Sequence, residues 1–210
     1  MSLARNTPNN VEPLRFSGDD HALVAALRLR HPGAAAALWD RYAQGVHRTI
    51  TRTLGPDAEA PDLLQETFIH ALADIRSLDD PSRLGPWLTT IAVFTARACL
   101  RRRARRKWLS VFSPVQVQPT VALPVADDVR QALQEVYAVL NTMPADERLA
   151  FALRLIDGLP LAEAAASMKV SLATFKRRLA KAEARFLAVA HKSPRLRAFI
   201  EEGERWELKA

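Results

Sequence analysis

The sequence predicts an all-α protein made of two small helical domains joined by an extended linker, the second a helix-turn-helix domain. Three observations carry this prediction. Helical periodicity runs from about Asp20 to Lys107, with no alternating segment long enough for a convincing strand. Residues 108–126 then hold three prolines and little charge, and they lack a helical period. Helical periodicity resumes at Asp127 and continues to about Lys192.

These changes of pattern divide the chain into five segments. We expect a flexible N-terminus (1–19), a first domain (20–107), a linker (108–126), a second domain (127–192) and a C-terminal tail (193–210). Glycine and proline predict breaks inside the two domains. The predicted breaks fall at Gly55-Pro56, Gly85-Pro86, Met143-Pro144 and residues 158–160.

Composition limits the partners and the compartment. The net charge of +7 favours an anionic partner, with nucleic acid as the first candidate and an anionic membrane as the second. Cys99 is the only cysteine, which excludes an intrachain disulfide and suits a reducing compartment. No apolar run approaches the roughly 20 residues needed to span a bilayer, and residues 1–10 lack a signal core. We therefore expect a cytoplasmic protein without membrane insertion.

Residues 161–186 form the most informative stretch, because they predict two short helices joined by a tight turn. Ser171 is placed to cap the second helix, and Lys169 stands where such turns often carry glycine. One side of the second helix is apolar: Phe175, Leu179, Ala182 and Phe186. Another side is polar and basic: Thr174, Arg177, Arg178 and Lys181. This arrangement is typical of a helix that enters a DNA major groove.

A second basic helix lies in the first domain, where seven cations fall between Arg97 and Lys107. Aromatic and basic side chains share one stripe of this helix: Trp87, Thr90, Phe94, Arg97 and Arg101. Aromatic rings interleaved with arginine suit the binding of unpaired bases. The alternative is that Trp87 and Phe94 are ordinary core residues of a small domain.

Residues 62–72, DLLQETFIHAL, predict a third helix with two distinct sides. The expected core stripe contains Leu64, Phe68, Ala71, Leu72 and Ile75. The expected outward patch is acidic and apolar, and contains Asp62, Gln65, Glu66 and Ile69. The two acids also suit the positive end of the helix dipole, so a capping role is the simplest interpretation, and it does not exclude partner binding.

Motifs of catalysis are absent from the sequence. It contains no HExxH, no phosphate-binding glycine-rich loop and no GxSxG, and its five histidines lack metal-ligand spacing. We therefore expect a binding protein rather than an enzyme, with no cofactor and no metal.

Taken in order, the three pieces resemble a bacterial sigma factor of the extracytoplasmic-function type. DLLQETFIHAL is similar to the region-two motif that grips the β′ coiled coil of RNA polymerase. The segment from Gly85 to Lys107 is similar to the part that captures and melts the minus-ten element. Residues 143–186 are similar to region four, which reads the minus-thirty-five element and touches the β flap.

The resemblance implies a transcription initiation factor that binds core RNA polymerase, recognises promoter DNA and helps to open it. The implied polymerase-binding residues are Asp62, Leu63, Gln65, Glu66 and Ile69. The implied minus-ten residues are Trp87, Thr90, Phe94, Arg97, Arg101 and Arg102. The implied minus-thirty-five residues are Ser171, Thr174, Lys176, Arg177, Arg178 and Lys181. The family usually has an anti-sigma factor, which adds a further candidate partner.

Some positions depart from the pattern of this family. Phe94 stands where members commonly carry asparagine, and Pro160 stands where a serine or threonine helix cap is usual. The alternative function is a helix-turn-helix transcriptional regulator that does not act as a polymerase subunit. A regulator needs only one DNA-binding domain, whereas this chain offers two candidate nucleic-acid faces.

Overall fold

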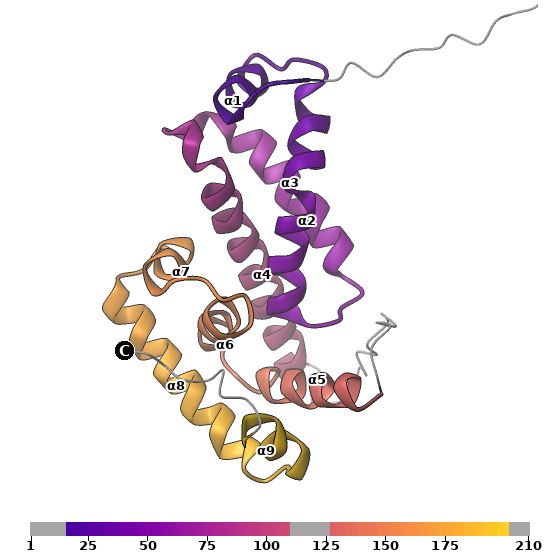
Figure 1. Cartoon of the computed structure of the whole chain (residues 1–210), viewed down its shortest axis with the longest axis vertical. Coiled ribbons are helices and arrows are strands. Elements are labelled where there is room, and N and C mark those ends of the chain that lie inside the picture. The colour runs from indigo at the N-terminus through magenta and orange to yellow at the C-terminus, as the bar shows by residue number, and fades with distance from the viewer. Residues whose placement is uncertain (1–15, 110–126, 202–210) are drawn as a thin grey trace, which may run out of the picture.

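The computed structural model describes residues 16–109 and 127–201, which are helical, as Figure 1 shows. No strand occurs within these two ranges, in agreement with the predicted all-α class. The α-helices are α1 (Asp20–Arg28), α2 (Ala34–Leu54), α3 (Ala60–Asp74), α4 (Leu84–Leu109), α5 (Asp127–Leu140), α6 (Ala145–Phe151), α7 (Leu161–Ser167), α8 (Leu172–Ala190) and α9 (Pro194–Glu201). Shorter turns are the 3-10 segments η1 (Ile75–Ser77) and η2 (Pro81–Arg83) and the π-helical η3 (Ala152–Ile156).

Three predicted segments lie wholly or largely outside the described residues. They are the N-terminus up to residue 15, the linker from residue 110 to 126 and the tail beyond residue 201.

The first domain is built on α2, α3 and α4, which pack against one another. Local chemistry sets the helix ends. The Asp19 carboxylate accepts the Ala22 N–H at 2.9 Å and caps α1. Gly55 ends α2 with a φ of 83°, a conformation that favours glycine, so this predicted break is confirmed.

The break predicted at Gly85-Pro86 is wrong in position. α4 already begins at Leu84, so both residues lie in its first turn. Proline is tolerated there because the first N–H groups of a helix have no partner within the helix. The chain bends earlier, between Leu78 and the short η2 turn, where the Asp80 carboxylate accepts the Ser82 N–H at 2.9 Å.

The second domain places α6 and α8 against one another, with α5 and α9 at their far end (Figure 1). The rings of Phe151 and Phe186 lie 4.9 Å apart in its core. Helix α9 lies at the start of the predicted tail, which begins at residue 193, and buries Leu196. Glu135 of α5 fixes this helix by accepting a hydrogen bond from Arg195 at 2.8 Å.

The two domains pack directly on one another, which the sequence did not predict. A single cluster of buried apolar side chains continues from α2 and α4 into α6, η3 and α7. Polar contacts add to this interface. Asp157 accepts hydrogen bonds from Arg52 at 2.6 Å and from Thr49 at 3.0 Å. The Tyr137 hydroxyl donates to the Arg52 carbonyl at 3.0 Å.

Candidate nucleic-acid interface

The predicted helix-turn-helix is formed by α7 and α8. The four apolar side chains predicted for the inner face of α8 are all buried: Phe175, Leu179, Ala182 and Phe186. Ser171 caps this helix, since its hydroxyl accepts the Thr174 N–H at 3.2 Å. Lys169 adopts a φ of 51° in the turn, at a cost of about 1 kcal/mol for a residue with a side chain. Pro160 precedes α7 without a side-chain cap hydrogen bond.

On the basic face of α8, some side chains are exposed to solvent and others contact neighbouring residues. Lys176, Arg177 and Lys181 are exposed and can reach a DNA groove. Arg178 is half-buried instead, and its Nη2 lies 3.1 Å from Oδ2 of Asp146 on α6. Thr174 is half-buried beside Ser171 at the start of the helix.

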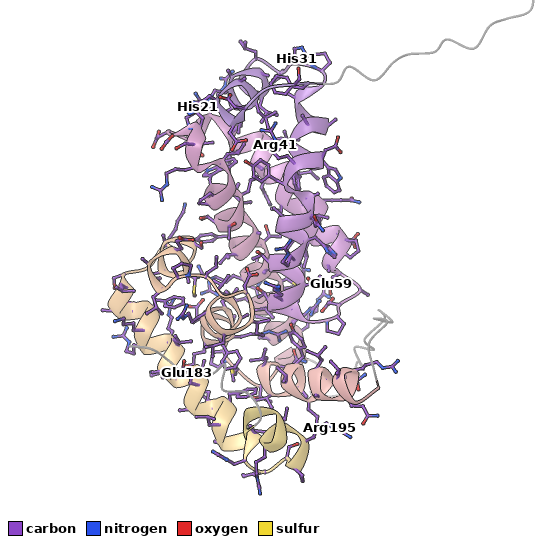
Figure 2. All side chains as sticks on the ribbon, in the orientation of Figure 1. His21, His31, Arg41, Glu59, Glu183 and Arg195 are labelled. Atoms are coloured by element: carbon purple, nitrogen blue, oxygen red, sulfur yellow. The ribbon has the colours of Figure 1, made fainter. Side chains whose placement is uncertain are left out.

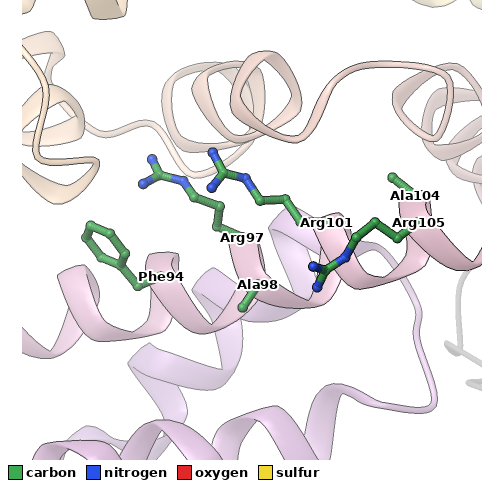
Figure 3. Close-up of a pocket in the computed structure, with 6 residues that line it drawn as sticks. All are labelled: Phe94, Arg97, Ala98, Arg101, Ala104 and Arg105. Carbon is green, nitrogen blue, oxygen red and sulfur yellow. The ribbon is translucent and has the colours of Figure 1, made fainter.

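The predicted aromatic and basic stripe borders a hollow of about 660 Å³ on α4, shown in Figure 3. Its lining residues are Phe94, Arg97, Ala98, Arg101, Ala104 and Arg105. Phe94 is 38% exposed, so it is not a core residue. The Arg97 guanidinium lies 4.8 Å from the centre of the Phe94 ring. A ring with cations beside it offers stacking and charge neutralisation to an unpaired nucleotide.

The other predicted minus-ten residues do not join this hollow. Trp87 is half-buried and packs against the core, as its alternative interpretation held. The Thr90 hydroxyl donates to the Pro86 carbonyl of its own helix at 3.0 Å. Arg102 pairs at 2.8 Å with Glu59, which immediately precedes α3 and is labelled in Figure 2. The structure therefore brings together Phe94, Arg97 and Arg101 and leaves Arg102 apart.

Arg102 belongs to a charged cluster that fixes α4 to the start of α3. Arg103 donates to Asp57 at 2.8 Å and pairs with Glu59 at 3.2 Å. Burial acts to raise the pKa of Asp57, but hydrogen bonds from Arg103 and the Glu59 N–H hold that pKa below its usual value. Burial also raises the pKa of the nearby Cys99 thiol to about 11, so this cysteine is protonated at neutral pH.

The outward patch predicted on α3 is present, with one correction. Asp62, Gln65 and Ile69 are exposed, and the Glu66 side chain is 44% exposed with His70 at 3.6 Å. Leu63 was predicted as a polymerase contact but is 2% exposed, because its side chain fills the core between helices. A buried side chain cannot also meet a partner.

The core stripe predicted for α3 also changes at one position. Leu72 was expected in the core but is 40% exposed, because the buried face of α3 is turned toward Leu63 and Thr67 and leaves Leu72 at its outer edge. On the neighbouring α2, Trp39 is 39% exposed while its ring lies 4.7 Å from that of Phe68 on α3. Trp39 is an exposed aromatic side chain that was not predicted from the sequence.

Asp146 contacts arginine side chains of both α4 and α8, a role that was not predicted from the sequence. It lies in the first turn of α6, with Oδ1 3.0 Å from Arg97 Nε and Oδ2 3.4 Å from Arg101 Nη2. Arg178 of α8 reaches the same carboxylate. Burial, together with Arg101 and Arg178, lowers the pKa of Arg97, and Asp146 opposes that shift.

The part of the chain that the structure describes offers neither a metal site nor a membrane span. No group of three or more histidine, cysteine, aspartate or glutamate side chains in residues 16–109 and 127–201 could hold a metal ion. Among the helices that the structure describes, none has the length and apolar character needed to cross a membrane.

Two family profiles match the two domains. Sigma-70 region 2 matches residues 38–108, from α2 to α4. Sigma-70, region 4, matches residues 133–186, from α5 to α8. The ECF RNA polymerase sigma-E factor of Escherichia coli (strain K12) is 29% identical over 175 residues, covering 78% of this chain and 90% of that protein. The sigma-E factor of Haemophilus influenzae is 27% identical over 172 residues, with the same coverage.

Solved structures agree with the sequence relatives. The sigma factor RpoE from Bartonella quintana, solved with the anti-sigma factor NepR, has a TM-score of 0.52 and 26% identity, covering 69% of this chain and 88% of that chain. CnrH, solved with the cytosolic domain of CnrY, shares the fold with a TM-score of 0.58 and 22% identity, covering 83% of this chain and 98% of that chain.

These findings do not favour a regulator that acts without polymerase. The two profiles follow one another in the expected order and together match more than half of the chain. Proteins of this kind work by binding rather than by catalysis. The chain therefore belongs to the sigma-70 family, as a sigma factor of the extracytoplasmic-function type that acts with RNA polymerase in transcription initiation.

Proposed function

We propose that this sigma factor uses three separate faces, one for core polymerase and two for promoter DNA. Residues 20–107 act as region two and residues 127–192 as region four. The observation that carries the assignment is the hollow on α4, where Phe94, Arg97 and Arg101 meet, combined with the exposed cations of α8. The protein works in the cytoplasm, without enzymatic activity of its own.

The polymerase-binding face is the outward side of α3. Asp62, Gln65 and Glu66 place acidic and polar groups around Ile69, which is 66% exposed. A small apolar centre with a charged rim suits a specific protein contact, here with the β′ coiled coil. The second domain contacts the β flap.

The two DNA faces divide the work of recognition and opening. Lys176, Arg177 and Lys181 set the register of α8 on the minus-thirty-five duplex and read its base edges. Ser171 and Thr174 contribute from the start of the helix, and Arg178 from one turn further along. Phe94, Arg97 and Arg101 hold unpaired bases of the minus-ten element. Trp87 and Thr90 lie outside the hollow, on the preceding turns of the same helix. Each stacked base returns about 1–3 kcal/mol of the cost of opening the duplex.

An anti-sigma factor is a further proposed partner. The related sigma factor RpoE was solved in complex with such a factor, NepR. We propose that a protein of the same class binds this chain.

Run-off transcription with purified core polymerase, this protein and a library of genomic fragments tests the function. We expect discrete transcripts that require both proteins. A helix-turn-helix regulator would bind fragments without directing core polymerase to any start site.

Replacing Arg177 by alanine should weaken promoter binding by roughly 5–150-fold, because a good side-chain contact to a base contributes about 1–3 kcal/mol of discrimination. Binding of the holoenzyme to promoter and random duplexes measures this effect. The matched control is Lys192→Ala, which removes an exposed cation beyond the end of α8. Equal losses on both duplexes would rule out base reading by Arg177.

Reversing the charge at Glu66 should reduce the capture of core polymerase at least tenfold. A lysine at this position would repel a polymerase surface that is complementary to the glutamate. Pull-down of core enzyme by Glu66→Lys measures the loss, and circular dichroism checks the fold. Asp79→Lys is the control, since it makes the same charge change at an exposed loop position outside α3. Unchanged capture by Glu66→Lys would remove α3 from the docking face.

A further inference from the structure

Exposed apolar side chains surround Lys176 on the side of α8 that carries the exposed cations. Helical spacing places Leu172 and Ala173 one turn before Lys176, on the same side of the helix. Ala180 follows one turn after it, and all three apolar side chains are exposed. Leu172 is the largest of them and is 43% exposed, while Phe175 enters the core. Leu172, Ala173 and Ala180 together form the apolar patch of α8.

The polar side chains of α8 can read some bases and not others. Arginine and lysine donate to guanine, whereas adenine is read by asparagine or glutamine, and cytosine by aspartate or glutamate. Helix α8 contains no asparagine, glutamine or aspartate, and its one glutamate, Glu183, lies half-buried in the second half of the helix. The Ser171 hydroxyl donates to the Thr174 hydroxyl at 2.9 Å, so these two groups are engaged with one another. The long polar side chains of this helix are therefore suited to guanine alone.

Thymine offers a group that needs no hydrogen bond. Its C5-methyl group projects into the major groove and makes apolar contacts with protein side chains. In a helix-turn-helix, the first residues of the second helix face the base edges. Leu172 and Ala173 occupy these positions on α8. They can distinguish an A·T pair from a G·C pair by the methyl group, without a hydrogen-bond acceptor.

The charges around the apolar patch favour DNA as its partner. The walls of a major groove carry phosphates, and its floor carries the base edges. Lys176 lies within the patch, and Arg177 and Lys181 follow beside it, all of them exposed. A protein segment docked on Leu172 would have to cover these cations as well. A groove instead offers phosphate to the cations and methyl groups to the patch.

We propose that α8 recognises thymine methyl groups through Leu172, with Ala173 beside it, in addition to guanine through Arg177. This inference rests on the proposed function, which it extends to the bases that are read. Leu172 and Arg177 are five positions apart, or about 7.5 Å along the helix. That distance corresponds to about two base-pair steps. The thymine contacted by Leu172 therefore lies about two base pairs from the guanine contacted by Arg177.

Deoxyuridine tests the proposal, because it differs from thymidine only in lacking the C5-methyl group. The probe is the duplex retained most tightly from a genomic fragment library by the full chain with core polymerase. Each thymine of its minus-thirty-five element is replaced in turn by deoxyuridine, and the affinity is measured again. We expect one or two positions to lose about fourfold in affinity, which corresponds to about 0.8 kcal/mol for one buried methyl-sized group.

Leu172→Ala in the full chain locates the contact, and Leu187→Ala is the matched control. Leu187 is 42% exposed on the same helix but lies in its last turn. At the sensitive positions, the ratio of affinities for the thymine and deoxyuridine duplexes should be about four for the natural chain and for Leu187→Ala. The ratio should fall to about one for Leu172→Ala. Arg177→Ala should weaken binding to both duplexes and keep the ratio, because it removes a different contact.

Two results would overturn the inference: equal binding of every deoxyuridine duplex by the natural chain, or an unchanged ratio for Leu172→Ala. A minus-thirty-five element without an A·T pair would overturn it as well. Failure of the proposed function has a different signature. A regulator that binds DNA without directing polymerase would give no run-off transcripts, yet its affinity would still depend on the thymine methyl group.

Discussion

Replacing Arg148 by methionine will lower the midpoint of thermal unfolding by about 6–12 °C, the largest effect we expect on stability. Arg148 lies on α6 and is 2% exposed. Its Nε donates to the Thr53 carbonyl at 2.9 Å, and its Nη2 donates to the Leu54 carbonyl at 2.7 Å. These carbonyls end α2, where a helix leaves its acceptors unpaired and its dipole is negative.

Methionine fills a similar volume but donates no hydrogen bond. The two carbonyls and the Asn141 side chain, which also accepts from Arg148, then lose their donor in a buried place. Losses of this kind cost about 3 kcal/mol in total. Burial lowers the pKa of Arg148 to about 10, so the guanidinium is still a cation at neutral pH.

The measurement is thermal unfolding followed by circular dichroism at neutral pH. Arg106→Met is the control, because it removes an exposed arginine near the end of α4. A shift of less than about 2 °C for Arg148→Met would show that water replaces the lost donor without cost.

The features that sequence predicted correctly are those set by neighbours along the chain. The faces of α8 follow helical spacing, the cap at Ser171 needs only Thr174, and Gly55 ends α2 through its own backbone. The contribution of Phe94 to an exposed stripe is local in the same way. The all-α class and the two domains were predicted for these reasons.

The features that sequence missed depend on residues far apart in the chain. Asp146 fits the first turn of any helix, and nothing near it predicts partners on α4 and α8. In the sequence, Arg148 is only one basic residue of a short helix. Its carbonyl partners at the end of α2 are about 95 residues away in the chain. Leu63 and Leu72 lie at opposite edges of the apolar stripe of α3, and a small rotation of the helix decides which of them is buried. The packing that buries one face decides between such rotations.

Replacing Phe94 by alanine should reduce promoter opening by roughly 5–150-fold while leaving closed-complex formation intact. The ring is 38% exposed and lines the hollow with Arg97, so we assign it to an unpaired base and not to the core. Loss of one stacked base removes about 1–3 kcal/mol from the open complex. The duplex-binding face on α8 is unchanged, so initial binding does not depend on the ring.

Permanganate reactivity of unpaired thymines in the holoenzyme complex measures opening, and a gel-shift assay at low temperature measures the closed complex. Phe94→Tyr is the matched control, because it keeps an aromatic face at the same position and should open DNA nearly as well. The exposed ring contributes little to folding, so Phe94→Ala should unfold within about 2 °C of the natural chain. Normal opening by Phe94→Ala would exclude stacking on this ring and leave Arg97 and Arg101 as the groups that hold the strand. A large fall in the unfolding midpoint would instead return Phe94 to a structural role between α4 and the turn at Lys169.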